Sequence, residues 1–190
     1  MSTKDFIIRK GETFSKVIRW AVPPIVWKPI TAVSQTAPVR LTVPGHDCPP
    51  GWSVEVESKC SLREIDGLKS QATVIDPNTI ELNTVNGSCL KAYKGGAVLR
   101  YYTPVDMTGM SARMAIKDKV GGAELLRLST LNGTIQIDVA ECSIRLILGA
   151  DVTEALGWKS GVYDLELETS MGVVSRLLEG KISVVDEVTT

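Results

Sequence analysis

The stretch Tyr163-Asp164-Leu165-Glu166-Leu167-Glu168 alternates strictly between apolar and acidic residues. The turn residues Ser170-Met171-Gly172 separate it from a second stretch rich in apolar residues, Val173-Val174-Ser175-Arg176-Leu177-Leu178. A period of two is typical of a strand that buries one face. The sequence therefore predicts a β-hairpin here, with Asp164, Glu166 and Glu168 on the solvated face. Gly180 is expected to mark a bulge in the second strand.

Working upstream, the same alternation recurs in shorter pieces separated by glycine turns. Apolar residues at every second position occur in four segments, 112–116, 126–128, 135–139 and 144–148. Strands spaced about 8–12 residues apart with turns between them predict a β-sandwich. Asp151-Val152-Thr153-Glu154 has the spacing of a helix capping box, and Gly157 is expected to end that single helical turn in a left-handed conformation.

The N-terminal half has a different residue pattern. Phe14, Ile18, Trp20 and Val22 share one face of an expected strand, which Pro23-Pro24 and Pro29 are then expected to end. Between 30 and 100, short apolar pieces alternate with dense turn signals such as Pro49-Pro50-Gly51 and Asn86-Gly87. The segment 52–57 is expected to form a half-exposed strand and 72–82 a hairpin, so this part predicts a small β-barrel or meander.

These residue patterns predict an all-β protein with a discontinuous sandwich. Residues 1–28 and 101–190 are expected to form the sandwich, and 29–100 to form the inserted small β domain, with Thr103-Pro104 near the second junction. Insertions are tolerated where chain ends emerge close together at a surface. The content of 21 Val, 14 Ile and 16 Thr also favours strands.

Composition excludes several classes of function. The formal net charge is −1, which argues against a nucleic-acid groove, because such a groove needs concentrated basic charge. The sequence has no apolar run of about 18 residues, so we expect no membrane-spanning helix. Phe6-Ile7-Ile8 is too short for a signal peptide, and synthesis in a cytoplasm is the expectation.

Candidate chemical groups are few, and a structural interpretation is favoured for each. His46 and Cys48 could pair as a base and a nucleophile, but a loop histidine before a strand explains them more simply. The three carboxylates of 164–168 could suggest a metal or an acid–base site, yet alternation alone accounts for them. The cysteines lack a Cys-x-x-Cys pair, which disfavours zinc, and a Cys60–Cys89 contact stays open. We therefore predict no enzymatic activity, no catalytic residue, no cofactor and no metal site.

The four tryptophans, Trp20, Trp27, Trp52 and Trp158, are expected mainly as core anchors. Trp27 lies in the proline-rich boundary and is the one expected to be most exposed. Trp27 and Trp52 are the candidate partner contacts.

Part of the sequence resembles virion proteins of tailed bacteriophages. The segment Thr103-Pro104-Val105-Asp106-Met107-Thr108-Gly109-Met110-Ser111-Ala112-Arg113-Met114-Ala115-Ile116-Lys117 is similar to a recurring opening, D-L-T-G-x-x-A-R-M-x-I-R, of an immunoglobulin-like sandwich in those families. The similarity continues at 161–167 and 174–181 and ends with Val184-Val185-Asp186-Glu187-Val188-Thr189. Residues 5–14 resemble the first strand of the same domain. Such domains occur at the N-terminus of baseplate upper proteins and in tail-fibre-associated proteins.

The middle of the chain resembles a second family. Ile30–Val39, Pro44-Gly45-His46, Gly51-Trp52-Ser53-Val54 and Asp76-Pro77-Asn78-Thr79-Ile80-Glu81-Leu82-Asn83 are similar to the phage version of the first catalytic-cysteine half-domain (FCCH) of ubiquitin-activating enzymes. The resemblance implies a fold. It implies no catalytic cysteine and no ubiquitin chemistry.

Together the two resemblances imply a non-enzymatic structural protein of a tailed-phage virion. A tail, collar or fibre-attachment component is expected, with other virion proteins and copies of itself as partners and the virion as its location. Two alternatives stay open: a head decoration or cement protein, and a module that binds a host surface glycan through Trp27 or Trp52. No nucleic-acid or membrane partner is expected.

Overall fold

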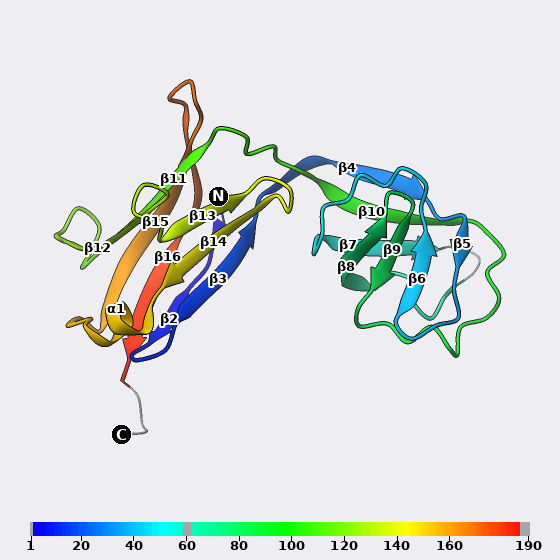
Figure 1. The fold of residues 1–190 in the computed structure, drawn as a ribbon, viewed down its shortest axis with the longest axis horizontal. Helices are drawn as coiled ribbons and strands as arrows, with labels where there is room; N and C mark the ends of the chain where they lie inside the picture. Colours follow the sequence, from blue (N-terminus) through cyan, green and yellow to red (C-terminus); the bar gives the residue numbers. More distant parts are fainter. Residues whose placement is uncertain (1, 59–61, 187–190) are drawn as a thin grey trace. The chain divides into compact units, whose positions relative to one another are not determined.

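The computed structural model describes residues 2–58 and 62–186, and the protein is all-β apart from one short helix (Figure 1). The chain divides into two compact units, Met1–Ile18 with Asp106–Thr190 and Arg19–Val105. The second unit is thus an insertion in the first, and the expected insertion, 29–100, lies inside it.

The larger sheet of the first unit contains the hairpin that the alternation predicted. Its strand order is β1-β16-β15-β11-β12, and β2 also pairs with β16. Its members are β1 (Ser2–Thr3), β2 (Phe6–Arg9), β11 (Ser111–Lys117), β12 (Glu124–Ser129), β15 (Ser160–Glu168) and β16 (Val174–Val185). The alternating residues of β15 are buried on one side and partly exposed on the other, as expected.

The second sheet of this unit has the order β13-β14-β3. It consists of β3 (Phe14–Arg19), β13 (Ile135–Asp138) and β14 (Ser143–Leu148). The two sheets form a β-sandwich, and their orders match the C′–C–F–G and B–E–D sheets of an immunoglobulin domain. The insertion therefore occupies the B–C connection, between β3 and β11. In immunoglobulin variable domains this connection carries a binding loop.

Side chains from both sheets fill the sandwich core. Ile116, Met114 and Leu165 of the larger sheet and Ile144 and Leu146 of the smaller one are fully buried. Fully burying a side chain of this size stabilises the fold by about 1.5–3 kcal/mol. Each of these residues occupies an alternate position of its strand, so the period-two pattern places the core on one face of each sheet.

Aromatic contacts attach the N-terminal strands to the rest of the sandwich. The ring of Phe6 stacks on that of Tyr163 at 5.3 Å between centroids and meets Phe14 edge-on at 6.0 Å. The Tyr163 hydroxyl donates to the carbonyl of Lys4 at 2.5 Å. Because Tyr163 is buried, its pKa is raised from the ordinary 10.0 to about 12, so the hydroxyl stays a donor even at the pH where an exposed tyrosine ionises.

The bulge of β16 differs from the sequence prediction. The register shifts between Leu165 and Glu166, which pair with Leu178 and Arg176, so the extra residue is Leu177 and not Gly180. Gly180 instead pairs in register with Tyr163, and a Cβ there would lie 2.2 Å from the Lys4 carbonyl oxygen. Glycine is required because the backbone between β1 and β2 passes this close.

The predicted helical turn exists as α1 (Ala150–Glu154), but its ends differ from those expected. Its N-cap is Gly149, which gives no side-chain cap, and its C-cap Ala155 is right-handed. The prediction of a capping box at Asp151–Glu154 is therefore wrong. Thr153 points inward instead, and its single hydroxyl proton is shared between the carbonyls of Glu12 and Ala150, which both lie 2.9 Å from the hydroxyl oxygen.

The inserted unit is a single antiparallel sheet that curls into a half-barrel, with the order β4-β10-β7-β8-β9-β6-β5. Its strands are β4 (Ala21–Pro29), β5 (Ala32–Val33), β6 (Val39–Thr42), β7 (Ser53–Ser58), β8 (Lys69–Asp76), β9 (Thr79–Leu82) and β10 (Ala97–Pro104). The expected strand at 52–57 and hairpin at 72–82 correspond to β7 and to β8–β9. Ile30 and Thr31, which connect β4 to β5, link the two ends of the sheet. The Ile30 N–H donates to the Ala97 carbonyl on β10, and the Thr31 N–H donates to the Thr42 carbonyl on β6.

The prolines do not end the pairing, contrary to the sequence prediction. The expected single strand from Phe14 to Val22 is split between β3 and β4, and β4 runs through Pro23, Pro24 and Pro29. β4 is an edge strand, and its register with β10 shifts between Tyr102 and Thr103, next to the Pro23-Pro24 pair. Edge strands and bulges are the sites where a sheet tolerates residues without an N–H. The unit therefore begins before the prolines and not after them.

Replacing residues 20–105 with a short Gly/Ser linker should leave a folded sandwich, because every strand of the first unit is retained. Circular dichroism and a cooperative unfolding transition would measure this. Replacing only 29–100 should give a less soluble product, since it leaves unpaired parts of β4 and β10. A molten product from the 20–105 replacement would contradict an autonomous sandwich.

Substituting Gly180→Ala should lower the free energy of unfolding by about 1–3 kcal/mol, because its Cβ would overlap the Lys4 carbonyl. Gly157→Ala is the matched control. It has open space around its Cβ position and an ordinary φ, and should change stability by less than about 0.5 kcal/mol. Denaturant unfolding of both variants would measure the difference, and equal stabilities would refute the close-approach argument.

Candidate functional site

A row of side chains crosses four strands on the outer face of the half-barrel. Trp27 on β4 pairs with Arg100 on β10, Arg100 with Glu55 on β7, and Glu55 with Lys69 on β8. The Arg100 guanidinium forms an ion pair with Glu55 and lies 5.6 Å from the centre of the Trp27 ring. Two interactions therefore fix this arginine in place.

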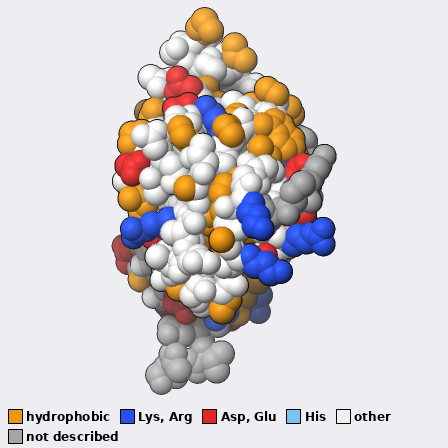
Figure 2. All heavy atoms as spheres, turned by 90° about the vertical axis from the view of Figure 1, so that its right-hand side faces the viewer, with side chains coloured by type: hydrophobic (Ala, Val, Ile, Leu, Met, Phe, Trp, Pro, Cys, Tyr) orange, Lys and Arg blue, Asp and Glu red, His pale blue; other side chains and the backbone are white. Residues whose placement is uncertain are grey.

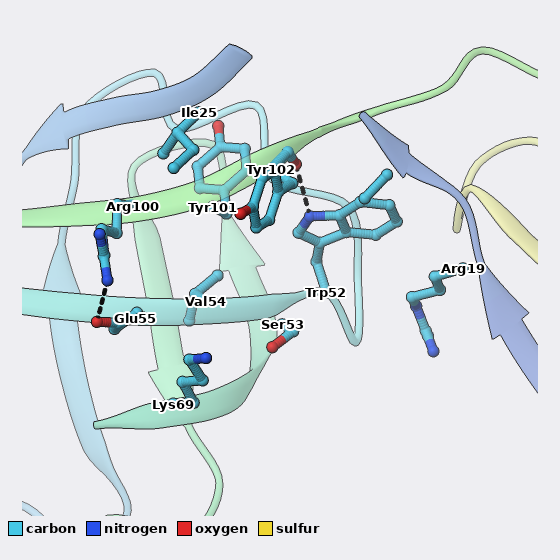
Figure 3. Close-up of a pocket in the computed structure, with 11 residues that line it drawn as sticks. Arg19, Ile25, Trp52, Ser53, Val54, Glu55, Lys69, Arg100, Tyr101 and Tyr102 are labelled. Carbon is cyan, nitrogen blue, oxygen red and sulfur yellow. Dashed lines mark hydrogen bonds and ion pairs between the residues drawn. The ribbon is translucent and has the colours of Figure 1, made fainter. Parts of the chain in front are cut away.

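A cleft of about 280 Å³ lies beside this row, within the inserted unit (Figure 3). Aromatic rings contribute to its lining, and the indole Nε1 of Trp52 donates to the Tyr102 carbonyl at 2.9 Å. In Figure 3, Arg100 and Arg19 lie at opposite ends of the cleft, with Tyr102 and Trp52 between them. The Tyr102 side chain is 53% exposed, so its ring is accessible to a ligand.

The two tryptophans proposed as partner contacts occupy different environments. Trp27 is 49% exposed, as expected for the proline-rich segment, but Arg100 lies over its ring. Trp52 is only 2% exposed and acts as a core anchor whose ring offers no free face for stacking. No sequence motif marks Arg19, Glu55, Lys69, Arg100 or Tyr102 as site residues, and none of the five was predicted. The alternation of β7 places Glu55 outward, but no sequence signal indicates which residues of β10 and β8 lie opposite it.

His46 and Cys48 are close in sequence but are held by the backbone. The imidazole Nδ1 accepts from the Cys48 N–H at 3.0 Å, and Nε2 lies 2.9 Å from the Asp76 carbonyl, to which it donates as N–H. Both ring nitrogens are thus occupied, and the ring is buried. Burial raises the pKa of the Cys48 thiol to about 12, which opposes formation of the reactive thiolate. The loop interpretation of His46 agrees with this arrangement.

The three carboxylates of β15 face arginines of the neighbouring strands. Arg113 donates to Glu166 at 3.0 Å and to Glu168 at 3.1 Å. Arg176 lies 3.3 Å from Asp164 and 3.8 Å from Glu166. Arg113, Glu166 and Arg176 are in register across β11, β15 and β16, so this surface is a ladder of ion pairs. Exposed pairs of this kind contribute little stability each, about 0–1 kcal/mol.

Within residues 2–58 and 62–186, no group of three or more His, Cys, Asp or Glu side chains is placed to hold a metal ion. Cys60, and with it the open question of a Cys60–Cys89 contact, lies outside the described residues. In the same part of the chain, no helix has the length and apolar character needed to cross a membrane.

Charged and hydrophobic side chains are interspersed on the face shown in Figure 2. Compared with known proteins, the sequence matches no family profile and no curated protein. Fold and surface chemistry therefore carry the functional argument. They define the protein as an immunoglobulin-like β-sandwich with a half-barrel inserted in its B–C connection.

Alkylation of the native protein with iodoacetamide at pH 8 should modify Cys89 and leave Cys48 unmodified. Cys89 is exposed, whereas Cys48 is buried with its pKa raised to about 12. Mass spectrometry of the peptides would measure both sites, with the unfolded protein as the control in which both react. Rapid labelling of Cys48 in the native state would instead indicate an activated thiolate.

Proposed function

We propose that this chain is a non-enzymatic structural protein of a tailed-phage virion, most simply a tail, collar or fibre-attachment component that docks other virion proteins. The discontinuous immunoglobulin-like sandwich carries the proposal. It is the architecture implied by the resemblance of 103–117 and 161–189 to phage virion domains. The half-barrel at 19–105 is likewise compatible with the FCCH-like resemblance of the inserted segment.

An apolar hairpin tip is the surface that we assign to docking. Met171, Val173 and Val174 lie at the turn between β15 and β16, and all three are exposed. Val120 and Leu131 are also exposed, but each stands alone in its own loop. Isolated exposed apolar residues are ordinary, whereas a contiguous group more often marks an interaction site.

Two other functions fit the same fold. A head decoration or cement protein would use the sandwich to clamp capsomers, and it differs from the main proposal only in its position in the particle. A host-glycan-binding module is supported by a separate observation, the accessible Tyr102 ring beside basic side chains on the half-barrel.

Immunogold labelling of intact virions with an antibody against this chain should give signal at the tail or collar, and mass spectrometry of purified virions should detect it. Signal over the whole head would favour the decoration protein. Absence from virions would refute the proposal.

A complementation assay tests the docking tip. Met171→Lys should reduce incorporation into particles by about tenfold or more, because it places a charge in a contact that must be desolvated. Leu131→Lys is the matched control, since Leu131 is at least as exposed but isolated, and it should incorporate normally. Equal incorporation of both variants would remove the tip from the docking surface.

A further inference from the structure

The cleft of the half-barrel carries more positive than negative charge. Its lining includes the cations Arg19, Lys69 and Arg100 and one carboxylate, Glu55. Glu57 lies on the same strand one row away, opposite Val98, and does not line the cleft. The Arg100–Glu55 pair is internally neutral, so Arg19 and Lys69 leave an excess of about two positive charges. This local excess occurs in a chain whose formal net charge is −1.

Neither of these two cations has a carboxylate partner among the residues that the structure describes. Arg19 donates from Nη2 to the Pro50 carbonyl at 3.3 Å, while its buried Nε has no hydrogen-bond partner. The Lys69 ammonium likewise forms no hydrogen bond or ion pair within the described ranges. A buried N–H without a partner is costly, and the Arg19 guanidinium therefore remains a positive charge with no acidic partner beside the cleft in the described part of the chain.

The rest of the cleft is suited to a ring. The exposed ring of Tyr102 lies between the basic ends in Figure 3, and Ile25 adds an apolar side chain. The volume of about 280 Å³ is slightly below the range of ordinary ligand pockets, about 300–1,000 Å³. It therefore accepts one ring with its substituents and not an extended chain. One accessible aromatic face beside charged donors suits a molecule with an apolar ring face and polar edges.

The neighbouring edge strand disfavours a peptide as the ligand. A peptide that adds to a sheet needs N–H donors along the edge. β4 is the edge beside this cleft, and its positions 23, 24 and 29 are prolines without an N–H.

We propose that this cleft binds a sugar residue that carries a carboxylate, such as a hexuronic acid or a sialic acid. The carboxylate accepts hydrogen bonds from Lys69 and from the Arg100 donors that Glu55 leaves free, and the exposed part of the Tyr102 ring packs against the ring of the sugar. Arg100 is already oriented by Glu55 and Trp27, so its ordering on binding costs little. The proposal concerns the inserted unit alone and does not depend on the position of the protein in a virion.

NMR titration of the full-length ¹⁵N-labelled protein tests the ligand class. The probes are the methyl glycosides of glucuronic acid and N-acetylneuraminic acid, with methyl glucoside as the match that lacks only the carboxylate of the glucuronide. At least one acidic sugar should shift the amides of Ser53, Lys69 and Tyr102 saturably and bind about tenfold or more tightly than methyl glucoside. No saturable shift with either acid would overturn the proposal. Acetate binding as tightly as the acidic sugars would overturn its sugar part.

Variants then test the residues. Lys69→Gln should weaken binding of the acidic sugar about tenfold or more, and Tyr102→Ala should weaken it by removing the stacking surface. Arg40→Gln is the matched control, because Arg40 forms an ion pair with Glu81 at 2.9 Å on the β6–β9 side of the half-barrel and lines no part of the cleft. Equal affinities for Lys69→Gln and Arg40→Gln would place the ligand elsewhere.

Discussion

The sandwich depends on the pairing of its first strands with its last one. β1 and β2 run parallel to β16, and the Lys181 N–H donates to the Asp5 carboxylate across 176 residues of sequence. The Phe6–Tyr163 stack and the Tyr163–Lys4 hydrogen bond act at the same place. Without these contacts β3 would have to hold the N-terminal segment in the sandwich alone. The close approach at Gly180 is the geometric condition for all of them.

Local patterns predicted most of the fold. The alternation in 163–178 predicted β15 and β16 because each strand buries one face, and the class of all-β sandwich with an inserted β unit follows from such patterns. The errors arose where tertiary context decides the outcome. Pro23 and Pro24 are strand breakers in a central strand, yet β4 is at an edge and its register shifts beside them. The glycine at 180 signals an unusual backbone site, but only the packed structure shows that Lys4 is the neighbour.

The candidate site was much harder to predict. Trp27 was correctly expected to be exposed, because it lies among prolines, and Trp52 is the core anchor that the alternation of 52–57 places on the buried face with Val54 and Val56. The row from Trp27 to Lys69 combines residues from four strands, and its composition depends on three cross-strand registers. Register is set by the global arrangement of the sheet, so a single sequence does not specify which cation lies opposite Glu55.

The location of the insertion in the B–C connection also has a consequence for synthesis. During translation the half-barrel is complete before β11 leaves the ribosome, and it can fold as a unit while the sandwich is still unfinished. β2 and β3 must wait for β16 and β14, which are made after it. For that interval the N-terminal strands expose unpaired edges. The order in which a ribosome delivers the strands thus makes the half-barrel the first folded part of the nascent chain and the parallel β2–β16 pair among the last contacts to form.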